Sequence, residues 1–137
     1  MKRCLLDTDV LSFYLRGQAQ VVRRVMHYLQ VHAQLELSVM SYYELRRGLV
    51  RIGATHRLQQ LEAFMRGCRV WEVSPEIARE AAEVAGQLAA RGEKLDDADV
   101  LIGATARVLG TGVATGNVRH FSRIEGLEVE DWLADRG

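Results

Sequence analysis

Acidic side chains follow several of the segments that look like buried strands. Asp7 directly follows the apolar run of residues 3–6, and Glu44 comes soon after a second apolar segment. Asp97 and Asp99 open a helical segment that leads to a further strand. Hard divalent cations such as Mg²⁺ and Mn²⁺ take oxygen ligands, usually one or two carboxylates with waters completing the shell. Because such ions neutralise phosphodiesters and activate water, this pattern predicts a metal site with phosphate chemistry.

The same acids also have structural interpretations. Asp9 is of a type that caps helices, and a helix is expected to begin there. Ser41 and Glu44 are spaced as a capping box, in which each side chain accepts from the other residue's backbone N–H. Asp96 or Asp97 could cap the helix that follows them. These roles and the metal site both stay open for the individual residues.

Short apolar segments alternate along the chain with longer segments of helical period. The apolar segments are nearly continuous, which is typical of strands buried in a parallel sheet with helices on both faces. The sequence therefore predicts an α/β fold, a three-layer α/β/α sandwich with a mostly parallel central sheet, in one domain over residues 1–137. Strands are expected at 3–6, 35–40, 69–74, 111–117 and 127–133, the last leading into a short helix, and helices at 9–16, 19–33, 41–52, 56–68, 76–92 and 97–110.

Composition restricts the other options. The 18 basic and 18 acidic residues give a formal net charge of zero, so no global basic signature marks a nucleic-acid partner. Arg46, Arg47, Arg51 and Arg57 nevertheless form a local cluster that suits either phosphate contacts or a solvated helix face. The two cysteines have no zinc spacing and fit reduced thiols. Since no apolar run is long enough to span a bilayer, we expect a cytoplasmic protein without membrane contact.

Four motifs in series resemble those of a known family. They are LLDTDVLSF, SYYELRRG, DDADVLIGATARVLG and GVATGNVRHFSRIEGLEVEDW, and together they cover essentially the whole chain. In order and spacing they resemble PIN-domain ribonucleases, most closely the VapC toxins of bacterial type II toxin–antitoxin modules. The resemblance implies a compact α/β/α sandwich that cleaves RNA with Mg²⁺ or Mn²⁺. It also implies a homodimer and a cognate antitoxin that neutralises the enzyme.

The resemblance assigns roles to individual residues. Asp7, Glu44 and Asp99 match the first three acids of the family and are the expected catalytic residues. Of these, Asp7 and Asp99 are expected to bind the metal, and Glu44 to orient or deprotonate the attacking water. Asp97 and Asn117 are expected to position the ligands from just behind them.

The last motif departs from the family pattern at one position. Thr115 and Asn117 match the T-x-N part of this motif, and Thr115 is expected to bond a carboxylate. His120, however, stands where the family often has a fourth acid. The departure favours a single tightly held ion with a weak or substrate-assisted second one, and it leaves His120 as either a substrate contact or an ordinary loop residue.

Two alternatives fit parts of the sequence. LLDTDVL approximates the opening of haloacid-dehalogenase-like phosphatases, in which Asp7 would be the nucleophile and Asp9 the acid–base partner. That reading lacks the usual glycine and threonine after the second aspartate and gives SYYELRRG no role. The other alternative is a catalytically silent PIN module that only binds RNA or protein.

Overall fold

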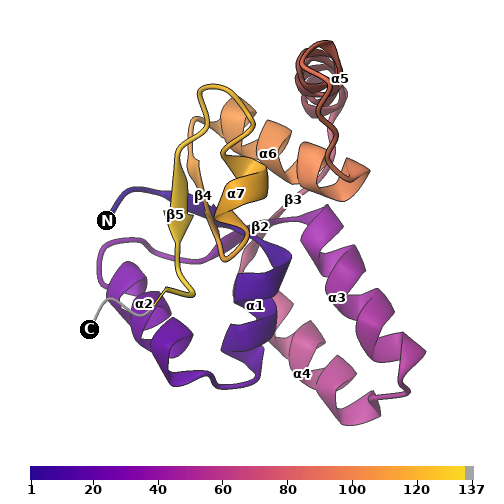
Figure 1. The fold of residues 1–137 in the computed structure, drawn as a ribbon. Coiled ribbons are helices and arrows are strands. Elements are labelled where there is room, and N and C mark those ends of the chain that lie inside the picture. The colour runs from indigo at the N-terminus through magenta and orange to yellow at the C-terminus, as the bar shows by residue number, and fades with distance from the viewer. Residues whose placement is uncertain (135–137) are drawn as a thin grey trace.

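A five-stranded parallel sheet forms the centre of the fold. The computed structural model describes residues 1–134, and its strand order is β3-β2-β1-β4-β5 (Figure 1). All four strand pairs are parallel. The strands are β1 (Cys4–Leu6), β2 (Glu36–Ser38), β3 (Arg69–Trp71), β4 (Gly112–Thr115) and β5 (Val129–Asp131).

Helices cover both faces of this sheet, because successive strand residues point to opposite sides. Leu6 packs into one core with side chains of the first four helices, whereas Leu5 packs into another with the last three. The predicted three-layer α/β/α sandwich is therefore confirmed. The helices are α1 (Thr8–Leu15), α2 (Ala19–Leu29), α3 (Val39–Arg51), α4 (Thr55–Met65), α5 (Pro75–Ala90), α6 (Asp97–Leu109) and α7 (Val118–Phe121).

The strand order places a topological switch point between β1 and β4. From β1 the chain builds outward through β2 and β3 on one side, while β4 and β5 lie on the other. In open α/β sheets, sites form at the carboxyl ends of strands beside such a point. Leu6 pairs with Ala114 there, so the residues that follow β1 and β4 are neighbours in space.

Some element boundaries differ from those expected. The third helix begins at Val39, where the backbone N–H of Met40 donates to the Ser38 hydroxyl at 3.0 Å. Residues 118–121 form an unexpected single turn of helix, α7. The short helix expected after residue 133 is absent up to residue 134, and residues 135–137 lie outside the described part. Within residues 1–134, no helix is long and apolar enough to cross a membrane.

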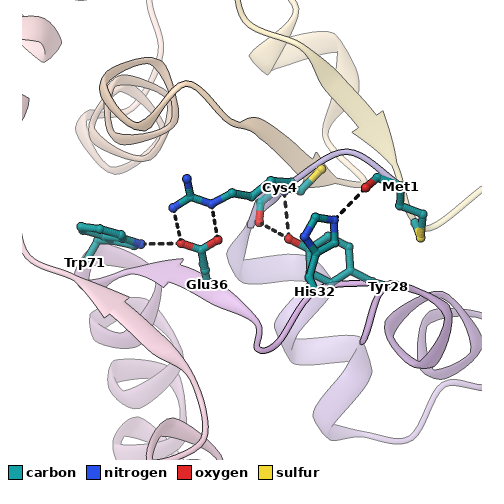
Figure 2. A network of polar contacts seen from close by, with 7 residues as sticks. Met1, Cys4, Tyr28, His32, Glu36 and Trp71 are labelled. Carbon is teal, nitrogen blue, oxygen red and sulfur yellow. Dashed lines mark hydrogen bonds and ion pairs between the residues drawn. The ribbon is translucent and has the colours of Figure 1, made fainter. Parts of the chain in front are cut away.

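The amino edge of the sheet, opposite the ends of β1 and β4, holds an ion pair in which the acid is buried and the arginine is exposed. Glu36, at the start of β2, accepts two hydrogen bonds of 2.6 Å from the Arg3 guanidinium and one of 2.9 Å from Trp71 Nε1 (Figure 2). Beside this pair, the Tyr28 hydroxyl accepts from the Cys4 backbone N–H at 3.1 Å. Arg3 lowers the pKa of Glu36, so the pair stabilises the folded protein above the ordinary pKa of glutamate.

Removing the guanidinium should weaken the fold in a pH-dependent way. We expect Arg3→Met to lower the free energy of unfolding by about 1 to 2 kcal/mol at neutral pH, since Glu36 stays buried with only Trp71 as partner. The loss should shrink as pH falls through about 4, where Glu36 is protonated without its partner. Urea unfolding at neutral pH and below about pH 4 measures this change in the free energy of unfolding.

Lys2→Met is the matched control, because Lys2 pairs with Glu128 on the surface, with side-chain exposures of 75% and 62%. That variant should unfold like the parent. A stability loss in Arg3→Met no larger than in Lys2→Met would contradict the structural role of the Arg3–Glu36 pair.

Candidate active site

Four carboxylates from three helices and a strand end line one pocket. Asp7, Asp9, Glu44 and Asp99 lie around a cavity of about 960 Å³ at the carboxyl edge of the sheet, and Asn117 joins them. They come from the end of β1, α1, α3 and the first turn of α6. Residues that are far apart in sequence thus meet at the switch point between β1 and β4.

Asp7 is the buried centre of this group, with 6% of its surface exposed. It follows β1 and caps α1, because its Oδ1 accepts from the Thr8 backbone N–H at 2.8 Å. Its Oδ2 accepts from the Thr115 hydroxyl, at the end of β4, at 2.7 Å. The Asp7 backbone N–H donates to the carbonyl of Ala114. Asp7 is therefore fixed from both strands.

Glu44 turns toward the pocket rather than back along its own helix. The Thr8 hydroxyl donates to Glu44 Oε1 at 2.7 Å. The capping-box interpretation is wrong, because α3 begins at Val39 and Ser41 is already inside the helix. Within the described chain, the buried Ser41 hydroxyl has no hydrogen-bond partner. The Glu44 carboxylate therefore does not cap α3 and can contribute to the pocket.

Asp9 is also not the helix cap that its residue type indicated, since Asp7 takes that place. Asp9 lies in the first turn of α1, where its Oδ1 accepts from the Val10 backbone N–H at 2.7 Å. Its Oδ2 accepts from the Gly116 backbone N–H at 3.1 Å, just after β4. A Cβ at Gly116 would clash with Leu133 Cδ1 and lie 3.0 Å from that oxygen, so a glycine lets both side chains approach the backbone closely. Asp9 thus ties α1 to the β4 loop.

The two acids in the first turn of α6, Asp97 and Asp99, face different directions. Asp99 is half-buried and lines the pocket, whereas Asp97 is exposed and does not. Residues two apart on a helix differ by about 200° in direction, so both cannot face one site. Asp96 caps the helix by position, without a side-chain hydrogen bond. A positioning role for Asp97 therefore has no contact to support it.

The loop after β4 carries a chain of hydrogen bonds toward Asp7. His120 Nδ1 donates to the side-chain oxygen of Asn117. The Asn117 backbone N–H donates to the Thr115 hydroxyl at 2.8 Å, and that hydroxyl donates to Asp7. Thr115 bonds the Asp7 carboxylate as expected, whereas Asn117 reaches Asp7 only through its backbone N–H and the Thr115 hydroxyl. His120 joins them through Asn117.

Burial and the charge of neighbouring carboxylates raise the pKa of Asp7 and of Asp99. Burial, followed by the charge of Asp9, raises the pKa of Asp7 to about 7. Burial, followed by the charge of Glu44, also raises the pKa of Asp99. A cation bound between these oxygens would relieve both effects.

The donor set suits a hard cation that keeps much of its water. Within residues 1–134, no three carboxylate, imidazole or thiol groups lie close enough to surround one ion directly. Mg²⁺ is usually held by one or two carboxylates and several waters rather than by a protein cage. Asp7 and Asp99 could bind such an ion, with Asp9 and Glu44 accepting from its waters.

Comparison with known proteins agrees with this geometry. The sequence profile of the PIN domain matches residues 4–127. The chain belongs to the PIN-domain family. This result confirms the predicted resemblance and removes the phosphatase alternative.

The relatives of this PIN domain carry VapC names. It is 27% identical over 133 residues to the tRNA(fMet)-specific endonuclease VapC of Shigella flexneri, covering 96% of this chain and 99% of the relative. It is 30% identical over 125 residues to ribonuclease VapC19 of Mycobacterium tuberculosis, covering 90% and 96%. The crystal structure of DNA-bound VapBC from Salmonella typhimurium superposes with a TM-score of 0.86 at 25% identity, covering 96% and 99%.

Several residues that line the pocket were missed from the sequence. Ser12 and Arg16 of α1, Gly48 of α3 and Gln60 of α4 extend the cavity away from the acids. The available signal was helical spacing, because Ser12 and Gly48 each lie four residues after Thr8 and Glu44, respectively. That spacing has meaning only once α1 and α3 are known to face each other.

We expect Asp7→Asn to stabilise the metal-free PIN domain. The folded-state pKa of about 7 lies above the ordinary value of 3.8, so ionising Asp7 costs stability as pH rises through that interval. The amide removes this cost and can still cap α1. In urea unfolding with chelator, the gain should be about 1–2 kcal/mol near pH 8 and smaller near pH 5. A variant less stable than the parent near pH 8 would contradict the strained-carboxylate interpretation.

Proposed function

We propose that this PIN domain is a Mg²⁺- or Mn²⁺-dependent endoribonuclease toxin that a cognate antitoxin neutralises. The observation that carries the proposal is the meeting of Asp7, Glu44 and Asp99 in one pocket of a chain whose relatives are named VapC ribonucleases. A phosphodiester substrate fits this chemistry, because the pocket is anionic and reaches phosphate through a cation.

Each residue then has a distinct task. A divalent cation supplies charge neutralisation at the phosphodiester and a lowered pKa for water. Asp7 and Asp99 bind it, and Thr115 holds Asp7 in place through the hydroxyl at 2.7 Å. Glu44, oriented by the Thr8 hydroxyl, would accept the proton of the water that attacks phosphorus in line. The ester P–O bond opposite the water then breaks, and the leaving oxygen takes a proton from solvent.

A single tightly held ion is the simplest form of this site. His120 is the residue that bonds Asn117 beside the acids, and an imidazole is not the ligand type that Mg²⁺ prefers. Its charge acts on Asp99 in the sense that lowers the pKa of that carboxyl. When protonated, His120 would thus offset part of the negative charge that a second ion would otherwise balance.

The partners follow from the relatives and from exposed apolar side chains. The Salmonella structure is named VapBC, which supports a cognate antitoxin here. Tyr43 on α3 and Met26 on α2 are 53% and 63% exposed, whereas Val25 and Leu45 are buried core residues. The exposed members therefore offer surface for an antitoxin or for a second copy in the expected homodimer. The cytoplasmic location stays a prediction.

Asp99→Asn is expected to abolish RNA cleavage without unfolding the protein. The change removes a proposed ligand charge at a half-buried position, and the amide conserves volume. Discrete fragments of total cellular RNA should appear with Mg²⁺ or Mn²⁺, disappear with chelator, and fall by about a hundredfold or more in the variant.

Asp96→Asn is the matched control, because Asp96 is an exposed cap of the same helix and asparagine caps equally well. It should cleave like the parent. Equal cleavage by Asp99→Asn and the parent would contradict the site. Folded, antitoxin-free parent protein that cleaves no RNA would favour the silent binding module instead.

A further inference from the structure

The pocket does not end at the acids but continues as a groove between two helices. Residues four apart on a helix share a face, and the pocket is lined by such a series from α1 and another from α3. Eight residues of helix rise about 12 Å, so the groove has about that length. The lining series are Thr8, Ser12 and the C-cap Arg16 of α1, and Glu44, Gly48 and the C-cap Ile52 of α3.

Gly48 lies in the middle of this groove, and neither backbone nor packing explains it. It is inside α3, where glycine is the poorest helix former after proline. Its φ is not positive, and a Cβ built there meets no atom within 4 Å. A larger residue would therefore fit the fold and favour the helix. What glycine does at this position is keep the groove free of a side chain.

The far end of the groove is basic. Arg16 and Arg57 line it together with Gln60, and all three are exposed. The Arg16 guanidinium also lies over the Phe13 ring, 4.5 Å from its centroid. Of the other arginines in the sequence cluster, Arg46 pairs with Glu62, Arg47 lies over the Tyr43 ring, and Arg51 does not line the pocket, whereas Arg16 and Arg57 do. These two guanidinium groups are thus the lining cations of the pocket within residues 1–134. Guanidinium groups bind phosphate oxygens well.

We propose that this groove is the path of the RNA strand across the enzyme. This inference rests on the proposed function. The scissile phosphate lies at the acids, a phosphate about three nucleotides further along the strand lies at Arg16 and Arg57, and the nucleotides between them pass over Gly48. A length of about 12 Å matches about three nucleotides of a stacked strand.

Charge and shape favour a single RNA strand as the occupant. Any substrate bound at the carboxylates enters the groove directly, and a polyanion gains from the arginines at the far end. Leu49 and Ile52 give apolar walls for a base, while Ser12 and Gln60 offer polar groups to its edge. Such contacts need an unpaired base, which is how proteins read RNA sequence.

Gly48→Met tests the path, with Gly86→Met as its matched control. Gly86 is also an exposed helical glycine whose added Cβ would meet nothing within 4 Å, but it lies on α5. Both changes should raise Tm by a few degrees. Binding of labelled single-stranded RNA is measured in the Asp99→Asn background, so that cleavage does not interfere. Gly48→Met should weaken binding by about tenfold or more, and Gly86→Met should not.

Arg57→Ala tests the basic end, with Arg79→Ala on α5 as its control. Losing one phosphate contact should raise KM by about tenfold with little change in kcat. It should also reduce the slope of log affinity against log salt by about 0.7, as for one contact to a single strand. Arg79→Ala should leave both unchanged.

The possible outcomes distinguish a failure of the groove proposal from a failure of the proposed function. RNA binding by Gly48→Met equal to that by Gly86→Met would overturn the groove as the strand path, even if the parent cleaves RNA. That result would indicate that the groove binds a protein segment instead. A parent that neither cleaves nor binds RNA would overturn both proposals together.

Discussion

The burial of one carboxylate at the centre of a parallel sheet governs the rest of this structure. Asp7 lies at the end of β1, held by the Thr8 backbone N–H and the Thr115 hydroxyl. The pairing of β1 with β4 brings the Thr115 hydroxyl to Asp7, so the register of the sheet and the site depend on each other. Burial and the neighbouring acids raise the pKa of Asp7 to about 7, which makes the unliganded site a cost to folding.

Each edge of the sheet holds a buried acid, and the pKa values of the two acids are shifted in opposite directions. At the amino edge, Glu36 receives the Arg3 guanidinium and Trp71 Nε1, and its pKa is lowered (Figure 2). At the carboxyl edge, Asp7 has no salt bridge within residues 1–134 and sits beside Asp9. Glu36 therefore stabilises the fold, while Asp7 is the carboxylate that we propose binds a cation. Glu36 thus has a structural role, whereas Asp7 has the proposed functional one.

Much of this arrangement could be predicted from the sequence, because parallel strands bring their carboxyl ends to one edge. Asp7, Glu44, Asp99 and Asn117 each follow or precede a predicted strand, and the structure brings them together. The features that the sequence pattern misplaced or missed depended on helix phase and on how the helices pack. Asp97 points away because α6 buries its other face, and the groove at Gly48 exists only because α1 and α3 pack side by side (Figure 1).

Calorimetric titration with Mn²⁺ tests the central claim, that the carboxylates around Asp7 form a cation site. The account predicts one ion per chain for the parent and none at the same concentrations for Asp7→Asn. Since the pKa of Asp7 is about 7, binding near pH 7 should release a fraction of a proton that disappears near pH 9. Buffers of different ionisation enthalpy measure this release. Equal Mn²⁺ binding by parent and variant, or proton release that does not change with pH, would contradict the account.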